Sequence, residues 1–343
     1  MAAGPSADPE IVSEKIAVIG SNSFSGAAFA GFCLERGLEV LGASRSEEPA
    51  LCFLPYRWLS RDIQSRFRFV RADLNHDLDP LISALDAFAP AYIVNFAAQG
   101  MVAPSWQHPE HWYQTNVVAN VRLHDRLRGR PWLQKYVHVG TPEVYGNTPG
   151  AITESAGFNP STPYAASRAA CDLHLRTFLA QYKFPVAWTR SANVYGPGQQ
   201  LYRIIPRTII SVKLGRKLSL HGGGHSTRSF IHVRDVADGT LRVARHAPVG
   251  ECYHLATSVF VSIRELVAMI CRIMNVDFND VVETAEDRPG KDAAYLLDSS
   301  KVRETLGWAE TIGLEQGVRE TVAWMEERFD EIRQQPLDYV HKE

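Results

Sequence analysis

The sequence predicts an α/β fold: a doubly wound parallel sheet with helices on both faces, followed by a smaller C-terminal α/β domain. Over the first 190 residues or so, short apolar runs alternate with segments of helical periodicity. The runs are almost continuously hydrophobic, as expected for parallel strands buried on both faces. Beyond that point the pattern breaks into short strands, glycine-rich turns such as "HGGGHS" (221–226) and two late helices.

The elements follow one another in a regular order. The predicted strands are 15–20, 39–44, 66–73, 91–98, 135–140 and 184–190. The main predicted helices are 25–37, 109–128, 164–182, 262–274 and 313–333. We therefore expect a disordered tail (1–13), a first domain (14–190) to which 229–250 returns, and a second domain (191–335).

Composition narrows the class of protein. The 343 residues are 45% hydrophobic and 22% charged, with a net charge of −2, which does not favour a nucleic-acid partner. No apolar run approaches the length of a membrane span, and "MAAGPSADPE" lacks the hydrophobic region of a signal peptide. The five cysteines are scattered and form no C-x-x-C pair, so we expect no metal site and a reducing, cytoplasmic environment.

The stretch "GSNSFSG" (20–26) links the first strand to the first helix. Gly20 and Gly26 keep the outer spacing of G-x-x-G-x-x-G, and Ser23 takes the middle position. A tight loop there lets backbone amides and a helix N-terminus meet a pyrophosphate. The context predicts a dinucleotide-binding Rossmann domain over 14–190, provided that Ser23 has a negative φ.

The tip of the second strand reads "GASRSEE", which places Ser44 and Arg45 where the cofactor's ribose is expected. NAD sites usually carry an acid at this point, whereas NADP sites use arginine for the 2′-phosphate. Arg45 therefore favours NADP over NAD, the alternative being an ordinary solvated loop cation. Asp73, at the end of the third strand, either accepts a hydrogen bond from the adenine amino group or caps the strand.

In "STPYAASR" (161–168), Tyr164 and Arg168 lie four residues apart at the start of a predicted helix. That spacing puts both side chains on one face. A guanidinium beside a phenol favours the phenolate, so the pair suits acid/base chemistry near neutral pH. The alternative is a surface pair without function.

Six motifs in register resemble those of the extended short-chain dehydrogenase/reductase family. They are "NFAAQG" (95–100), "TNVVAN" (115–120), "GTPEVYG" (140–146), "TPYAASR" (162–168), "NVYGPG" (193–198) and "RSFIHVRDVADG" (228–239). Within that family the chain is similar to nucleotide-sugar 4,6-dehydratases of the dTDP-glucose or GDP-mannose type. "DRPGKDAAYLLDSSKVRETLGW" (287–308) resembles their C-terminal segment, and the likeness covers roughly 14–325.

The resemblance implies a role for each residue of the candidate catalytic group. Tyr164 falls on the family's catalytic tyrosine, and Arg168 on a lysine that binds the nicotinamide ribose and lowers the tyrosine pKa. Thr141 would bond the sugar's 4-hydroxyl or ketone, and Glu143 matches the base. Pro142 stands where a general acid would protonate the departing C6 hydroxyl, which proline cannot do.

The resemblance also implies two sets of binding residues. The cofactor set is Gly20, Ser23, Phe24, Gly26, Ser44, Arg45, Asp73, Leu74, Ala97, Gln99 and Asn116, together with Tyr164 and Arg168. For the sugar nucleotide, Asn193, Arg228 and Arg288 would contact phosphates, and Arg203, Leu220, His221 and Tyr295 would surround the nucleoside. Taken singly, each is equally a turn residue, a cap or a surface charge.

The expected activity is conversion of an NDP-hexose to an NDP-4-keto-6-deoxyhexose, by C4 oxidation, loss of water across C5–C6 and hydride return to C6. The alternatives are an NDP-sugar decarboxylase of the UDP-glucuronate type, a 4-epimerase, or a non-catalytic NADP-binding regulator. Glu143 argues against an epimerase, which needs no base there. Thr141, Glu143 and Tyr164 together argue against a regulator.

We also expect a homodimer. The helices 109–128 and 164–182 carry apolar residues on more than the sheet-facing stripe, and the family pairs these helices in a four-helix bundle. The residues concerned are Val117, Val118, Leu123, Leu173, Leu175 and Phe178.

Overall fold

The computed structural model describes residues 14–148, 150–285 and 296–342. Its centre is a seven-stranded, wholly parallel sheet in the order β11-β7-β5-β4-β1-β2-β3. The strands are β1 (Lys15–Ile19), β2 (Glu39–Ser44), β3 (Phe67–Arg71), β4 (Tyr92–Asn95), β5 (Lys135–Val139), β7 (Val186–Ser191) and β11 (Cys252–Leu255). Strand order reverses between β1 and β4, so a crevice forms there at the carboxyl ends.

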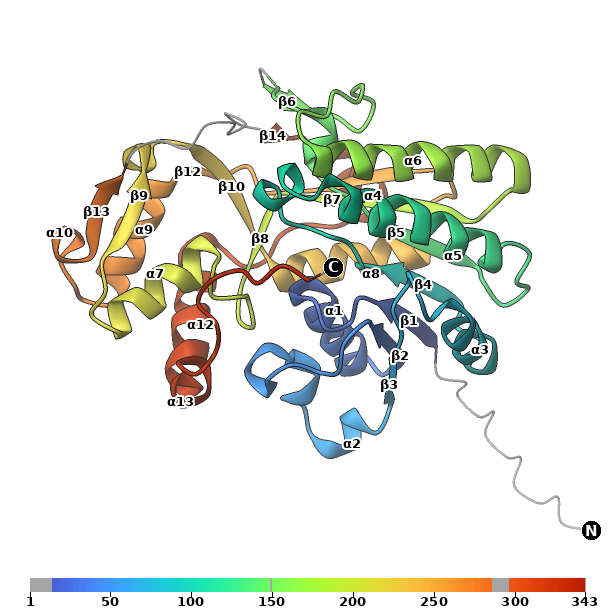
Figure 1. Ribbon diagram of the computed structural model, residues 1–343, viewed down its shortest axis with the longest axis horizontal. Helices are drawn as coiled ribbons and strands as arrows, with labels where there is room; N and C mark the ends of the chain where they lie inside the picture. Colours follow the sequence, from blue (N-terminus) through green and yellow to red (C-terminus); the bar gives the residue numbers. More distant parts are fainter. Residues whose placement is uncertain (1–13, 149, 286–295, 343) are drawn as a thin grey trace, which may run out of the picture.

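The central strands are mostly apolar because both faces of the sheet are covered. In β1, Ile16 and Val18 join one core cluster, while Ala17 and Ile19 join the other. On the first face lie α1 (Phe24–Glu35), α8 (Val233–His246) and α11 (Ser300–Leu306); on the second lie α3 (Leu78–Phe88), α5 (Asn120–Leu127) and α6 (Pro163–Tyr182). The predicted doubly wound α/β sheet is confirmed (Figure 1).

One predicted helix has an irregular centre. The segment 109–128 consists of α4 (Pro109–Tyr113), a π-helical turn η4 (Gln114–Ala119) and α5. The Asn120 side chain donates to the Thr115 carbonyl (2.9 Å), five residues back. Asn116 faces the loop after β4, where its Oδ1 accepts from the Gln99 amide (2.8 Å) and its Nδ2 donates to the Gln99 carbonyl (3.1 Å). These side-chain bonds account for the wider turn.

The second part of the chain forms smaller sheets against the main one. They are β12-β10-β8 (Phe260–Ser262, Thr227–His232, Asn193–Tyr195), β13-β9 (Val282–Ala285, Leu218–His221) and β14-β6 (Leu296–Leu297, Ala151–Ile152). Helices α7 (Ile204–Lys213), α9 (Ile263–Ile273), α10 (Phe278–Val281), α12 (Leu314–Glu327) and α13 (Phe329–Ile332) complete it. The shorter elements are η1 (Leu51–Phe53), η2 (Pro55–Arg57), α2 (Arg61–Gln64), η3 (Ala103–Trp106), η5 (Pro142–Tyr145) and η6 (Gly222–Gly224).

A buried carboxylate ties the two parts together. Asp235, in the first turn of α8, accepts from the backbone amide and hydroxyl of Thr311 (2.9 and 2.8 Å) and from the Ile312 amide (3.2 Å). These bonds fix the stretch that leads into α12. After α13 the chain turns back towards the middle of the molecule (Figure 1).

Among the described residues, no helix combines the length and the apolar character needed to cross a membrane.

Candidate active site

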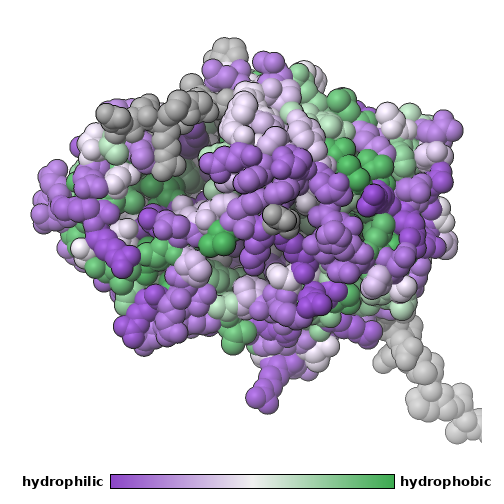
Figure 2. All heavy atoms as spheres, viewed as in Figure 1, coloured by the Kyte–Doolittle hydropathy of each residue, from purple (hydrophilic) through white to green (hydrophobic). Residues whose placement is uncertain are grey.

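A cavity of about 1130 Å³ lies at the carboxyl ends of the strands, between the main sheet and the second part of the chain. Polar side chains predominate over the middle of the molecular face shown in Figure 2. Sixteen of the predicted site residues line this cavity: Gly20, Ser23, Phe24, Ser44, Arg45, Asp73, Leu74, Ala97, Gln99, Thr141, Glu143, Tyr164, Arg168, Asn193, Arg203 and Arg228. Residues far apart in sequence are thus brought to one wall.

The loop between β1 and α1 is a close-fitting cradle. Gly20 has φ +86°, and a Cβ on it would lie 2.7 Å from the Ala97 nitrogen. A Cβ on Gly26 would lie 2.2 Å from the Gly20 carbonyl oxygen. Ser23 has φ −75° and caps α1: its hydroxyl donates to the Gly20 carbonyl (2.7 Å) and accepts from the Gly26 amide (3.2 Å). The structure therefore meets the φ condition for serine, and the cradle fits a pyrophosphate.

The β2 and β3 tips lie at the far end of the same wall. The Ser44 hydroxyl accepts from the Asn22 amide (2.9 Å), which joins the β2 tip to the cradle loop. Arg45 directs Nη2 to the Lys342 carbonyl (3.3 Å). Asp73 lines the cavity and also caps a turn, since its Oδ1 accepts from the Asn75 amide (2.8 Å).

Asn116 does not appear on the cavity wall. It is buried behind Gln99, whose backbone it holds at both polar groups, and its Nδ2 also donates to the Ser167 hydroxyl (2.9 Å) of α6. Gln99 itself reaches the cavity, and its Nε2 donates to the Lys342 carbonyl (2.6 Å). In this structure Asn116 positions Gln99 rather than facing a ligand.

The candidate catalytic groups come from the turn η5, directly after β5, and from α6. Thr141 caps η5, and its hydroxyl donates to Glu143 Oε2 (3.2 Å), which holds the carboxylate at the cavity wall. Tyr164, near the start of α6, is 9% exposed. Burial, and then the Glu143 charge, raise the pKa of Tyr164, while the Arg168 charge and a hydrogen bond with Thr141 lower it. The net shift is upward, so the positive charge of Arg168 opposes the cost of burial.

Arg168 is buried and has polar partners beneath the site. Its Nη2 donates to His138 Nε2 (3.2 Å) and to the Val139 carbonyl. Burial, followed by the charges of Arg168 and Arg190, holds the pKa of His138 well below its ordinary value. His138 is therefore neutral and accepts through Nε2. Sequence reasoning missed it, although a histidine inside the buried strand "KYVHVG" was the available signal.

Three buried side chains in this layer have metal-ligand chemistry: His124, His138 and Cys171. The Tyr136 hydroxyl accepts from Asn95 (2.7 Å) and lies 3.0 Å from His124 Nε2. Arg168 donates to His138 Nε2, so that nitrogen of His138 is already used inside the protein.

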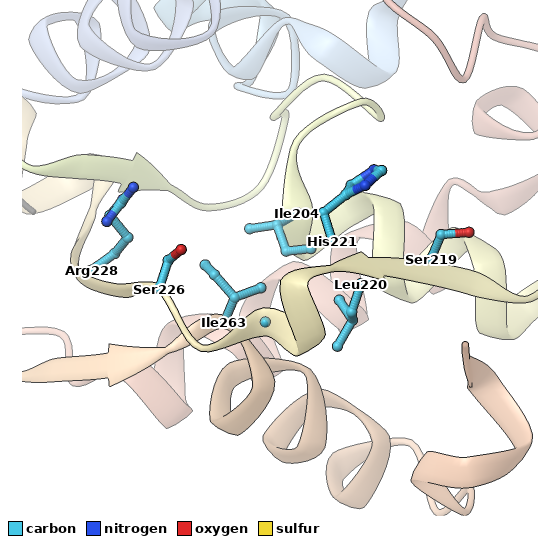
Figure 3. A pocket seen from close by; sticks show the side chains of 8 residues that line it. Ile204, Ser219, Leu220, His221, Ser226, Arg228 and Ile263 are labelled. Atoms are coloured by element: carbon cyan, nitrogen blue, oxygen red, sulfur yellow. The ribbon is translucent and has the colours of Figure 1, made fainter. Parts of the chain in front are cut away.

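Two of the four predicted nucleoside residues, Leu220 and His221, line a second, smaller cavity of about 220 Å³ together with Arg228, a predicted phosphate contact (Figure 3). Arg228 also borders the large cavity. In the large cavity, Asn193 donates to the Ser229 carbonyl (3.1 Å) and Arg203 precedes α7. The two remaining predicted residues, Arg288 and Tyr295, lie outside the described residues.

The sequence analysis gave no role to the chain beyond residue 335. Five residues of this segment line the large cavity: Pro336, Asp338, Tyr339, Val340 and Lys342. The stretch "QPLDYVHKE" (335–343) has neither helical nor strand periodicity and matches no motif, so no sequence signal marked it.

Comparison with known proteins agrees with this geometry. The family model for GDP-mannose 4,6 dehydratase matches residues 18–321. The dTDP-D-glucose 4,6-dehydratase of Bos taurus is 32% identical over 248 residues, covering 69% of this chain and 68% of that protein. The dTDP-glucose 4,6-dehydratase of Haemophilus influenzae is 30% identical over 280 residues, which cover 76% of this chain and 82% of that protein.

Solved structures give the same result. The dTDP-glucose 4,6-dehydratase of Streptomyces venezuelae, solved with NAD bound, has a TM-score of 0.81 at 29% identity and covers 92% of this chain and 98% of its own. The dTDP-glucose 4,6-dehydratase of Bacillus anthracis, in complex with NAD, has a TM-score of 0.81 at 27% identity. The match covers 93% of this chain and 98% of that one. The resemblance predicted from the motifs is confirmed. The chain belongs to the GDP-mannose 4,6-dehydratase family of extended short-chain dehydrogenases/reductases.

Proposed function

We propose that this protein is an NAD(P)-dependent nucleotide-sugar 4,6-dehydratase, a hydro-lyase that converts an NDP-hexose to an NDP-4-keto-6-deoxyhexose. The observation that carries the proposal is the convergence of Thr141, Glu143 and Tyr164 on the cavity that also holds the glycine cradle. A phenol, a carboxylate and a dinucleotide site in one cavity supply the base for each half of the reaction. The dehydratase relatives support the same chemistry.

In the first half, Tyr164 takes the proton of the sugar's 4-hydroxyl. The nicotinamide, when bound, supplies the redox chemistry, taking a hydride from C4 and returning it to C6. Arg168 stabilises the phenolate, because its charge lowers the pKa of Tyr164. The cradle around Gly20 and Gly26 holds the pyrophosphate of the cofactor.

In the second half, the C4 ketone makes the C5 hydrogen acidic and Glu143 removes it. The hydroxyl then leaves C6 as water and takes up a proton. Pro142 has no proton to give, so protonated Glu143 returns the one it took from C5. Thr141 holds the Glu143 carboxylate at its place on the wall (3.2 Å). The elimination therefore needs no second acid, and after hydride addition at C6 the resulting enolate takes up a solvent-derived proton at C5.

The substrate's diphosphate is assigned to Asn193 and Arg228, and its nucleoside to the side of Arg203; all three residues border the large cavity. The experiment that tests the proposal is incubation with a panel of UDP-, dTDP-, GDP- and CDP-hexoses and UDP-glucuronate. A 4-keto-6-deoxy product supports the dehydratase. Carbon dioxide released from UDP-glucuronate indicates a decarboxylase instead, and binding without turnover indicates a regulator.

We propose that the protein is cytoplasmic and homodimeric. All five cysteines are free thiols, which suits a reducing compartment. Of the predicted interface residues, Val118 and Leu173 are 37% and 51% exposed, whereas Leu123 and Leu175 are buried in the core. The interface is therefore assigned to the outward stripe of η4 and α6, including Val118 and Leu173.

Changing Glu143 to Gln tests the C5 base. The amide is nearly isosteric, so binding should persist, while dehydration falls by roughly two to four powers of ten. Tyr164 remains, so a 4-ketohexose that keeps its C6 hydroxyl should form, and solvent deuterium should no longer enter C5. Mass spectrometry of quenched reactions measures both. Tyr164→Phe is the control, since it should block ketone formation itself. Wild-type dehydration by Glu143→Gln would place the base elsewhere.

Changing His138 tests the support of Arg168. In His138→Leu the guanidinium keeps the Val139 carbonyl but loses its side-chain acceptor, so it is held less firmly and lowers the pKa of Tyr164 less. Because the phenolate is the active form, the rise of kcat with pH should move upward by about one unit. His138→Gln keeps an acceptor oxygen and should restore the profile. Identical pH profiles for all three folded proteins would contradict the role of His138.

Changing Arg45 to Ala tests the NADP preference, which we propose from the position of Arg45 on the cavity wall. An arginine that contacts the 2′-phosphate contributes to NADP binding only. The affinity of the variant for NADP should therefore fall about tenfold or more, while its affinity for NAD should change little. Calorimetry on cofactor-free protein measures both affinities. An equal loss for the two cofactors rules out a 2′-phosphate contact.

Light scattering coupled to gel filtration tests the dimer. At micromolar concentration the wild type should have twice the chain mass, and Leu173→Asp should give monomers because it buries a charge at the interface. Asp substitution of the exposed Val249, which lies outside both helices, serves as control. A monomeric wild type would reject the proposal.

A further inference from the structure

The last described residues form part of the wall of the large cavity. Residues 338–342, here called the tail segment, follow α13 and return to the centre of the molecule (Figure 1). Asp338, Tyr339, Val340 and Lys342 line the same cavity as the glycine cradle. The tail segment and the candidate cofactor residues thus face one cavity.

The tail segment is anchored on one side by the second part of the chain. Arg207 of α7 donates to the Leu337 carbonyl (2.7 Å) and pairs with Asp338 (3.1 Å). The ring of Tyr339 meets Tyr202 edge-on, with 5.5 Å between centroids. These contacts lead the chain into the cavity from the side of the predicted substrate residues.

Aromatic stacking on the main domain provides the other anchor. His341 Nε2 lies 2.9 Å from His111 Nδ1 in α4, which is a hydrogen bond. The His341 ring also stacks on the buried Trp112, with 5.1 Å between centroids and 8° between planes. The tail segment therefore bridges both sides of the cavity at defined contacts.

Directly after the second anchor, the tail segment takes up two donors of the predicted cofactor site. The Lys342 carbonyl accepts from Gln99 Nε2 (2.6 Å) and from Arg45 Nη2 (3.3 Å). Both donors belong to the predicted cofactor set. A segment that only covered a bound dinucleotide would leave these donors to the ligand. Here a backbone oxygen occupies the point where they converge.

We propose that the tail segment is an intramolecular competitor of the dinucleotide, and that its docking discriminates against NADP more than against NAD. The proposal rests on the cofactor site of the proposed function. Either cofactor displaces the carbonyl from Gln99. NADP also requires Arg45 for its 2′-phosphate, so it binds only when both hydrogen bonds are released. Docking reduces the apparent affinity by the fraction of molecules in which the site is open.

The test compares the full chain with a chain lacking 338–343, which keeps Leu337 and its bond to Arg207. Calorimetry on cofactor-free proteins should show at least threefold tighter NAD binding and a larger gain, about tenfold, for NADP. His111→Ala removes an anchor without touching the cavity wall and should shift both affinities in the same direction by less. His246→Ala, an exposed histidine on α8, should leave both unchanged.

Hydrogen exchange gives an independent readout in the full chain. NADP should speed exchange of the tail-segment amides, because it displaces the segment; slower exchange would mean that the segment closes over the ligand. Weaker or unchanged binding after deletion overturns the proposal. If neither cofactor binds any variant, the cofactor site fails as well. If binding shifts as expected but no NDP-hexose is dehydrated, only the proposed function fails.

Discussion

The close approach of β1 and β4 at the switch point is the constraint on which the site depends. The chain leaves β1 at Gly20 with its backbone so near Ala97 that no side chain fits between them. Without that contact the first helix would begin further from the sheet, and the cradle would lose its shape. The same contact fixes where the loop after β4 begins. The positions of Gln99, Glu143 and Tyr164 in the cavity wall therefore depend on the contact between Gly20 and Ala97.

Beneath the candidate catalytic groups, a network of buried polar side chains stabilises charge in the protein interior. Arg168 rests on His138, and on the next turn of α6 Asp172 accepts from Arg190 (2.6 Å). Arg190 in turn donates to the Tyr145 hydroxyl (3.2 Å). A buried guanidinium without such partners costs several kcal/mol, so each partner is needed to keep the next in place. The family's usual lysine has fewer donors, and arginine at this position uses the additional ones on His138 and Val139.

Much of this arrangement could be predicted because its signals are local. Apolar runs predict buried strands, and a glycine at each end of "GSNSFSG" predicts the cradle. Only the backbone angle φ of Ser23 had to come from the structure. His138 was missed because its partner lies 30 residues away in sequence. The tail segment was missed for a stronger reason. Its position depends on contacts with Arg207, Trp112 and Gln99, which come together only in the folded chain.

The π-helical turn η4 determines how the segment α4–η4–α5 would respond to the loss of one residue. A π-helical turn accommodates an extra residue, which keeps the helix before it and the helix after it in phase with the sheet. Removing one residue there would restore a regular helix, with Trp112 and Leu123 still facing the interior. The fold would tolerate that deletion. Asn116 would rotate away from Gln99, however, so the shortened protein would keep its core and lose the alignment of its cofactor wall.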